Sequence, residues 1–192
     1  MIARWLSAAL ILSLLAPIEG WDEQSEHAIQ DLRRPALERP MLSISSACNP
    51  TTLSAGLLAV ALLGGPPGIE TARIAVLALA PTNLVVEGLK RLTFRARPDG
   101  EHKRSNASFP SSHAANLFAL AVVFSRHWRR AAPLFYLIAT IVSASRLYLN
   151  RHFPTDVLFG AAIGALCAFG TLRLWERRRA RREAGLAGRA MQ

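Results

Sequence analysis

The sequence has little of what small extracellular scaffolds are built from. Only 2 of its 192 residues are cysteines, and Cys48 and Cys167 lie in such different surroundings that nothing indicates a pair. The 12 glycines and 11 prolines are too few for a collagen-like chain, and a hydrophobic fraction of 51% excludes a disordered one. Acidic residues are also scarce, since 13 of them oppose 23 lysines and arginines and leave a formal net charge of +10.

Long apolar stretches are what the chain has in abundance. None of them alternates with a period of two residues, so helices are favoured over barrel strands. Because a bilayer span needs about 20 residues and several stretches are shorter, helix ends should reach into the polar interface. The pattern predicts an all-α integral membrane helical bundle of about six transmembrane helices, or five if the N-terminal segment is cleaved. The stretches are 6–18, 53–64 (starting as early as Met41), 74–89, 114–124, 131–148 and 157–172.

The first 50 residues form two segments with different predicted roles. Residues 1–20 carry Arg4, a short apolar run and Pro17, which suits either a signal peptide or a transmembrane helix, and the lack of an A-x-A cleavage site favours the helix. Residues 21–50 have an acidic excess and are predicted to lie outside, as an interfacial amphipathic helix or a solvated loop. The apolar face of that helix would hold Trp21, Ala28, Ile29, Leu32 and Leu37.

The C-terminal end is strongly basic. Seven arginines follow Leu172, and residues 176–192 are predicted to form a cytoplasmic tail next to a membrane-embedded core at 51–175. The same rule places the Arg126–Arg130 turn in the cytoplasm. Because the tail adjoins a membrane helix, membrane anchoring explains its charge better than nucleic-acid binding, and no nucleic-acid partner is expected.

A G-x-x-x-G motif occurs in the last apolar stretch. Gly160 and Gly164 permit two helix backbones to approach closely. We expect them to pack inside the bundle rather than to mediate dimerisation.

Two connections between the apolar stretches carry the unusual polar residues. Lys90, Arg97, Ser111, Ser112 and His113 lie between the third and fourth stretches, and Arg146, His152 and Asp156 between the fifth and sixth. Ionisable groups at the ends of spans are costly, so they are candidates for function. If the two connections meet, Lys90, Arg97 and Arg146 would attract an anion, and backbone N–H groups at the start of the next helix would add to a phosphate cradle.

The histidines indicate chemistry beyond binding. His152 and Asp156 are four residues apart, so the carboxylate could hold one ring nitrogen and leave the other as a nucleophile. His113 could protonate a leaving oxygen. With cations to neutralise the developing charge, the set predicts phosphoryl transfer through a phosphohistidine without a metal or other cofactor.

Other interpretations of the same residues fit less well. A metal site at His113, His152 and Asp156 would face repulsion from the three cations. A Ser111–His152–Asp156 hydrolase triad leaves the arginines without a role, and the G-x-S-x-G motif is absent. A purely structural bundle accounts for any one of these residues but not for their combination.

These residues resemble three signatures of a known family. Lys90 to Pro98 fits K-x6-R-P, Pro110 to His113 fits P-S-G-H except at Ser112, and Ser145 to Asp156 fits S-R-x5-H-x3-D. The chain is therefore similar to the type 2 phosphatidic acid phosphatases, whose site is shared with vanadium haloperoxidases. The resemblance implies a six-helix fold with His152 as nucleophile, Asp156 as its partner and His113 as acid. It also implies phosphate binding by Lys90, Arg97, Ser111, Ser112 and Arg146.

Two positions depart from the family pattern. Ser112 replaces a glycine, which matters only if the backbone there needs a positive φ, and Phe94 stands where many members have glycine. Glu87, one helical turn before Lys90, is expected at most to support it.

The sequence thus predicts a multi-pass membrane phosphatase acting on a lipid phosphate or diphosphate. Suitable substrates are phosphatidate, phosphatidylglycerophosphate, a polyprenyl diphosphate or a lipid A phosphate. The site is expected on the external or periplasmic side. The alternatives are a vanadate-dependent haloperoxidase-like enzyme and a non-catalytic phospholipid-binding protein.

Overall fold

The computed structural model describes residues 20–101 and 106–190, and every regular element in these ranges is helical. The predicted all-α class is therefore confirmed. The expected helix at residues 1–20 lies outside the described residues. The elements are a helix over residues 20–31, α2 (Pro35–Ser46), α3 (Pro50–Leu63), α4 (Gly65–Thr93), α5 (Ser112–His127), the short 3₁₀ helix η2 (Arg129–Ala131), α6 (Ala132–Tyr148) and α7 (Pro154–Ala190).

Local start signals fix several of these helices. Asn49 caps α3, because its side chain accepts a hydrogen bond of 2.9 Å from the Thr52 backbone N–H. Ser111 is the N-cap of α5, as its place before the apolar stretch indicated. Proline opens α2, α3 and α7, at a position where its missing N–H costs nothing.

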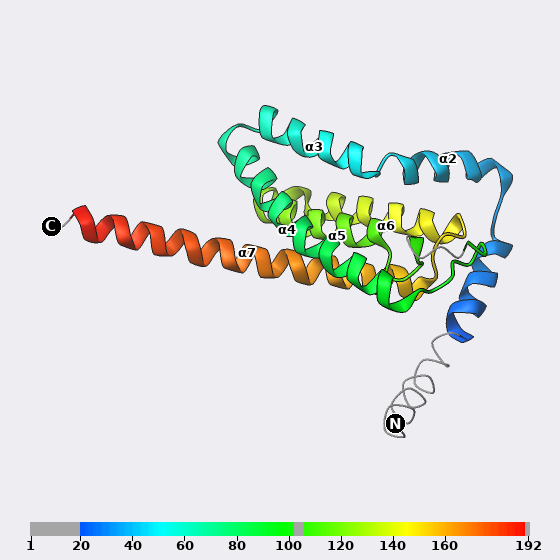
Figure 1. Ribbon diagram of the computed structural model, residues 1–192. Helices are drawn as coiled ribbons and strands as arrows, with labels where there is room; N and C mark the ends of the chain where they lie inside the picture. Colours follow the sequence, from blue (N-terminus) through cyan, green and yellow to red (C-terminus); the bar gives the residue numbers. More distant parts are fainter. Residues whose placement is uncertain (1–19, 102–105, 191–192) are drawn as a thin grey trace, which may run out of the picture.

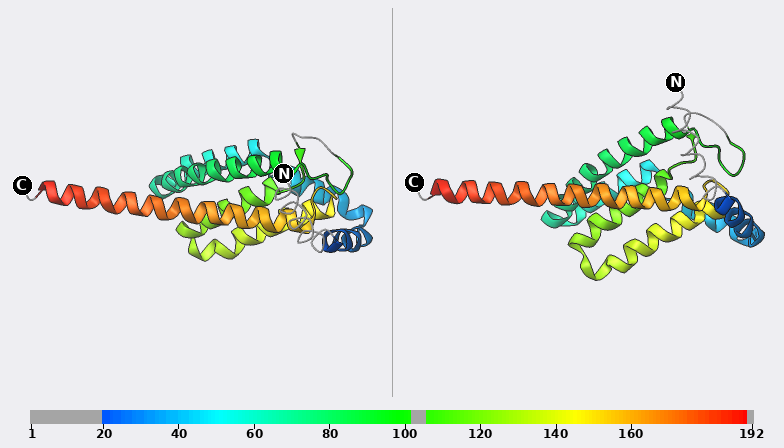
Figure 2. Two further views of the ribbon diagram at one scale, coloured as in Figure 1. Left: turned by 60° about the horizontal axis from the view of Figure 1, so that its bottom comes forward. Right: turned by 90° about the horizontal axis from the view of Figure 1, so that it is seen from below.

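Helix α5 lies at the centre of the bundle. It packs against α4, α6 and α7, while α3 lies along α4, and α2 lies along α6. Figure 1 shows α7 running the length of the bundle and continuing well past it at the C-terminal end. The connection between α4 and α5, the α6–α7 connection and the helix over residues 20–31 gather at the opposite end, as both views in Figure 2 also show. This end holds the polar residues singled out in the sequence.

The distribution of apolar side chains suits a lipid environment. The buried interior is rich in small residues, among them Ala75, Ala78, Ala114, Ala115 and Ala119. Large side chains such as those of Leu58, Leu84 and Leu166 are exposed instead. Small residues let helices approach closely, and exposed leucines are favourable in a bilayer, so this arrangement is the one expected of a membrane bundle.

Among the described residues, three helices are long and apolar enough to cross a membrane: α4, 129–148 (η2 with α6) and α7 over Pro154–Leu186. The number becomes four if α2 and α3, which are bent by 58° at the break between them, count as one span. Helix α5 has only 16 residues, about 24 Å, and is the most enclosed by its neighbours. The stretches predicted at 74–89, 114–124, 131–148 and 157–172 are helical throughout, and 53–64 is helical up to Leu63, where α3 ends.

The two glycines of the G-x-x-x-G motif bring α7 against α5. A Cβ atom on Gly164 would lie 1.9 Å from the Ala115 carbonyl oxygen, and one on Gly160 would lie 2.5 Å from that of Ser111. No side chain fits at such distances, so the prediction that the motif packs inside the bundle is confirmed. Cys48 and Cys167 are both free thiols.

Residues 20–46 form helices at the site end rather than a loop. Their apolar residues Trp21, Leu32 and Leu37 are exposed, whereas Asp22 is fully buried. Side chains tie this segment to the end of α6: the Gln30 amide donates to the Leu147 carbonyl, and Tyr148 Oη binds the Arg34 backbone. The segment therefore covers the end of the bundle where the polar residues gather.

Candidate active site

A cavity of about 580 Å³ opens at this end of the bundle. Helix α4, the α4–α5 connection, α5, α6 and the α6–α7 connection all contribute to it, so the two polar connections do meet. Residues from α2 and from its junction with α3 close it on another side. Six of the eight residues predicted for the site line this cavity, namely Lys90, Arg97, Ser112, His113, Arg146 and His152.

Three cationic side chains converge on the cavity. Lys90 and Arg97 are only 7% exposed, yet each reaches the cavity from a different element. Arg97 is held by the Asn106 side chain at 2.6 Å and by the Arg151 carbonyl at 2.9 Å. Arg146 donates to Ser45 Oγ at 2.5 Å, and its buried Nε has no partner within the described part of the chain. Buried cations with few facing carboxylates favour an anionic ligand.

The His152 ring is held in one orientation. Its Nδ1 lies 2.8 Å from the Ser108 carbonyl oxygen, so Nδ1–H donates and Nε2 keeps its lone pair. The residue is 3% exposed, and this burial lowers the pKa of the His152 imidazole to about 4. A neutral imidazole with an available nitrogen is therefore present at neutral pH, as nucleophilic attack requires.

Asp156 supports His152 indirectly rather than by the direct hydrogen bond expected from their spacing. Its Oδ2 is 3.7 Å from His152 Nδ1, longer than a hydrogen bond. The same oxygen accepts from Ser108 Oγ at 2.5 Å and from the Phe153 N–H at 2.8 Å. Because α7 begins only at Pro154, His152 precedes the helix and the four-residue spacing does not act on a helical face. Ser108 thus links carboxylate and imidazole.

Behind Asp156 lies a buried network that the sequence did not reveal. Arg95 bridges two carboxylates, donating to Asp156 Oδ1 at 2.8 Å and to Asp22 Oδ2 at 2.7 Å, and it stacks on the Phe153 ring. Asp22 also accepts from the Thr155 backbone N–H at 3.0 Å and from the Thr155 hydroxyl. The segment that carries His152 is therefore connected to the helix over residues 20–31, here called the N-terminal helix.

The two serines of the second signature differ in position. Ser111 is fully buried behind the cavity, where its Oγ accepts from the Ala114 N–H and its own N–H donates to the Asp156 carbonyl at 2.9 Å. Its hydroxyl is thus used to cap α5 and makes no bond to His152, unlike a triad serine. Ser112 lines the cavity and is the first residue of α5, where the backbone is helical and no glycine is needed.

The structure also places Phe94, which departs from the family pattern, and Glu87, which was expected at most to support Lys90. Phe94 ends α4 in the left-handed conformation with φ of 46°, which is why glycine suits this position and a phenylalanine there is strained. Glu87 is exposed on α4 and does not line the cavity that Lys90 reaches.

The metal interpretation receives no geometric support from the described residues. Over 20–101 and 106–190, no three His, Cys, Asp or Glu side chains are placed so that they could hold one metal ion. Asp156, one of the three proposed ligands, already accepts hydrogen bonds from Ser108, Phe153 and Arg95. The cavity instead presents cations and two imidazoles, which suit an oxyanion.

A family model described as "PAP2 superfamily" matches residues 71–180, which is more than half of the chain and runs from the first turns of α4 into α7. The chain belongs to the PAP2 superfamily. This family is the one whose three signatures the sequence resembles, so that prediction is confirmed.

Curated relatives of this PAP2 protein are named as lipid phosphatases. It is 39% identical over 85 residues to a lipid A 1-phosphatase of Porphyromonas gingivalis, covering 42% of this chain and 18% of that one. It is 33% identical over 107 residues to phosphatidylglycerophosphatase B of Bacillus subtilis, covering 49% and 53%. The chain thus spans less than two thirds of the length of these relatives.

Two solved structures share the fold. LpxE of Aquifex aeolicus aligns with a TM-score of 0.68 and 25% identity, over 78% of this chain and 93% of that one. A transmembrane PAP2 type phosphatidylglycerolphosphate phosphatase from Bacillus subtilis aligns with a TM-score of 0.70 and 24% identity, over 92% and 96%. The PAP2 protein is therefore an all-α membrane protein.

Proposed function

We propose that this PAP2 protein is a membrane phosphatase that removes a terminal phosphate from a lipid phosphate or diphosphate. One observation carries the proposal: a neutral, oriented His152 imidazole shares a cavity with His113 and with the cations Lys90, Arg97 and Arg146. Both curated relatives described above are named as phosphatases of lipid-linked phosphates, and this supports the substrate class.

In the first step, Nε2 of His152 attacks phosphorus, and the bond from phosphorus to the lipid oxygen breaks. Burial, with a smaller contribution from Arg146, lowers the pKa of His113 to about 4, so His113 takes up its proton together with the phosphate dianion that enters the cavity. It gives this proton to the lipid oxygen, so the lipid leaves as an alcohol or as a lipid monophosphate. Lys90, Arg97 and Arg146 neutralise the charge that develops on the phosphoryl oxygens, as a metal does in other phosphatases. The Ser112 backbone N–H at the start of α5 adds a donor and the positive end of the helix dipole.

In the second step, water attacks the phosphohistidine and the P–N bond breaks. The now neutral His113 takes a proton from that water, and inorganic phosphate is released. Ser108 keeps Nδ1 protonated throughout, while Asp156 fixes the Ser108 hydroxyl and stabilises the transient positive charge on the ring. We further propose that this cavity faces the external or periplasmic side and that the basic tail is cytoplasmic.

Long-chain lipid phosphates are expected to have a far higher kcat/KM than glycerol phosphate or p-nitrophenyl phosphate. The cavity lies at the end of the bundle, so acyl chains can remain in the bilayer while the headgroup enters, and each buried CH₂ contributes about 0.8 kcal/mol. The gain should appear in KM, since ground and transition states share it. Phosphate release by purified protein in mixed micelles measures this, and equal efficiency for soluble and lipid esters would contradict it.

Chelation is expected to leave activity intact, whereas vanadate inhibits. Lys90, Arg97 and Arg146 supply the positive charge, and vanadate mimics five-coordinate phosphorus on His152. The assay is phosphate release after dialysis against EDTA, compared with the same sample reloaded with Mg²⁺ or Zn²⁺. An enzyme silenced by EDTA and restored by either metal would overturn this part of the proposal.

A further inference from the structure

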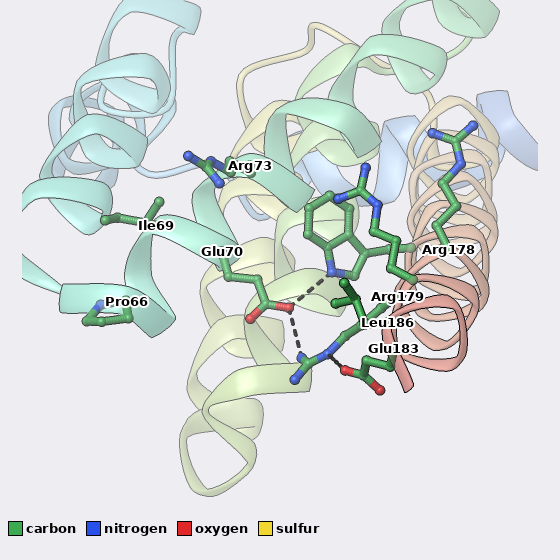
Figure 3. A pocket seen from close by; sticks show the side chains of 10 residues that line it. Pro66, Ile69, Glu70, Arg73, Arg178, Arg179, Glu183 and Leu186 are labelled. Atoms are coloured by element: carbon green, nitrogen blue, oxygen red, sulfur yellow. Dashed lines mark hydrogen bonds and ion pairs between the residues drawn. The ribbon is translucent and has the colours of Figure 1, made fainter. Parts of the chain in front are cut away.

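A second polar cavity lies at the end of the bundle opposite the candidate active site. It has a volume of about 670 Å³ and is formed by the start of α4 and the part of α7 that extends past the bundle. Arg73 and Glu70 on α4 line it together with Arg178, Arg179 and Glu183 on α7. Figure 3 shows Glu70 facing Arg179 and Glu183, whereas the Arg73 side chain points away from α7. Neither the family signatures nor the proposed reaction uses any of these residues.

The cavity carries an excess of positive charge. Glu70 accepts from Trp175 Nε1 at 3.0 Å and from Arg179 Nη1 at 3.5 Å, and Arg179 also pairs with Glu183 at 3.0 Å. Both glutamates are thus occupied by one arginine and one indole. Arg73, Arg178 and Arg182 line the same cavity and form no ion pair within the described part of the chain.

An apolar cavity continues from the basic one. Its volume is about 640 Å³, and it runs between α3 and α4 past Leu57, Leu58, Val76 and Leu77. The two cavities share Ile69, Arg73 and Trp175 as lining residues. They therefore form one continuous surface, with guanidinium groups at one end and aliphatic side chains along the other.

The depth of this surface matches the leaflet opposite the active site. Asp156 and Trp175 lie on the same helix 19 positions apart, which corresponds to about 29 Å along its axis. The hydrocarbon core of a bilayer is about 30 Å thick, so a helix end that places Asp156 at one interface brings Trp175 to the other. Tryptophan and arginine are both favoured at that depth.

We propose that this surface binds an anionic glycerophospholipid of the opposite leaflet. Arg73, Arg178 and Arg182 hold the headgroup phosphate, and one acyl chain lies between α3 and α4. A nucleic acid or a soluble anion could use the arginines but has no use for the apolar continuation, so a lipid accounts for both halves. Its bound lipid would brace the extended part of α7 against the α3–α4 turn.

Native mass spectrometry of the full chain with dioleoyl phosphatidylglycerol and dioleoyl phosphatidylcholine tests this directly. Phosphatidylglycerol is a phosphodiester and has no terminal phosphate for the proposed reaction to remove. We expect at least fivefold preferential retention of phosphatidylglycerol, lost in R178Q/R182Q. The matched control R177Q/R181Q removes the same charge at the same spacing on α7, outside the cavity, and should retain the preference.

The apolar half needs a variant of its own. Ala61→Phe fills the cavity between α3 and α4, and should reduce retention of dioleoyl but not of dihexanoyl phosphatidylglycerol. All four arginines of the two double variants are exposed, so their melting temperatures should equal that of the wild type. Equal losses in the two double variants would show a diffuse attraction by the tail and overturn the site, as would retention that is indifferent to headgroup charge. Displacement of the lipid by millimolar glycerol phosphate would show that a soluble anion is the ligand.

Discussion

Replacing His152 with alanine is expected to lower kcat by several orders of magnitude, because the nucleophile that divides the reaction into two steps is lost. The substitution leaves the Ser108 carbonyl without its donor at a cost of about 1–3 kcal/mol, which a bundle of this size should tolerate. Phosphate release from a long-chain lipid phosphate measures the effect. Rapid acid-free quenching of the wild type with labelled substrate should also trap phosphate on the protein, and His152→Ala should trap none.

The matched control for that experiment is His127→Ala. His127 is exposed at the far end of α5, beside Trp128, and takes no part in the cavity. Its replacement should leave kcat unchanged. Activity of His152→Ala within tenfold of the wild type, or phosphate trapped on that variant, would remove His152 from the role of nucleophile.

Replacing Asp22 with asparagine is expected to have the second-largest effect. The change keeps an acceptor for the Thr155 N–H but removes the negative charge that pairs with Arg95. Because Asp22 has no exposure, losing one partner of this ion pair is costly. Arg95 contacts Asp156, and Thr155 precedes Asp156 in the chain, so the segment that carries His152 should shift. Since even 1 Å of misplacement can cost about 100-fold, we expect kcat to fall by a factor of this order, with little change in KM.

Asp31→Asn serves as the control, because Asp31 lies on the same N-terminal helix but is exposed. A positioning role and a purely structural one can be separated by assaying well below the melting temperature of the Asp22 variant. If melting drops but kcat in the cold is unchanged, Asp22 only stabilises the fold. If both kcat and KM are unchanged and melting is normal, the network has neither role.

The helices were predictable because lipid and protein neighbours impose the same requirement on the sequence. Every backbone polar group in a bilayer has to be satisfied within its own segment, so long apolar stretches become helices wherever they occur. The start of α4 was less predictable: its first turns contain Gly65, Pro66 and Gly68, which suggest a connection rather than a helix. Proline at the first turn and an exposed environment make that start possible.

The site was predictable to the extent that its residues bear charges at the ends of apolar stretches. Placing the charges of Lys90, Arg97 and Arg146 there is energetically costly, and this cost indicates that they have a function. Ser108 and Asp22 carried no such signal. Ser108 contributes through its backbone carbonyl, which every residue has, and through a hydroxyl that is unremarkable in a polar connection. An aspartate in an acidic segment is normally solvated. Only the tertiary contact with Arg95 and Thr155 distinguishes Asp22 from the acidic residues around it.

The contact between Asp22 and Thr155 also has a consequence for biogenesis. The two residues are 133 positions apart, and synthesis proceeds from the N-terminal side. At an elongation rate of about 5–20 residues per second, Asp22 is made about 7 to 27 seconds before Thr155. During that interval its carboxylate lacks its native partner on α7. Helix α7 therefore both brings Asp156 to its place behind His152 and draws the helix over residues 20–31 into place, so that the site is completed only after α7 has been made.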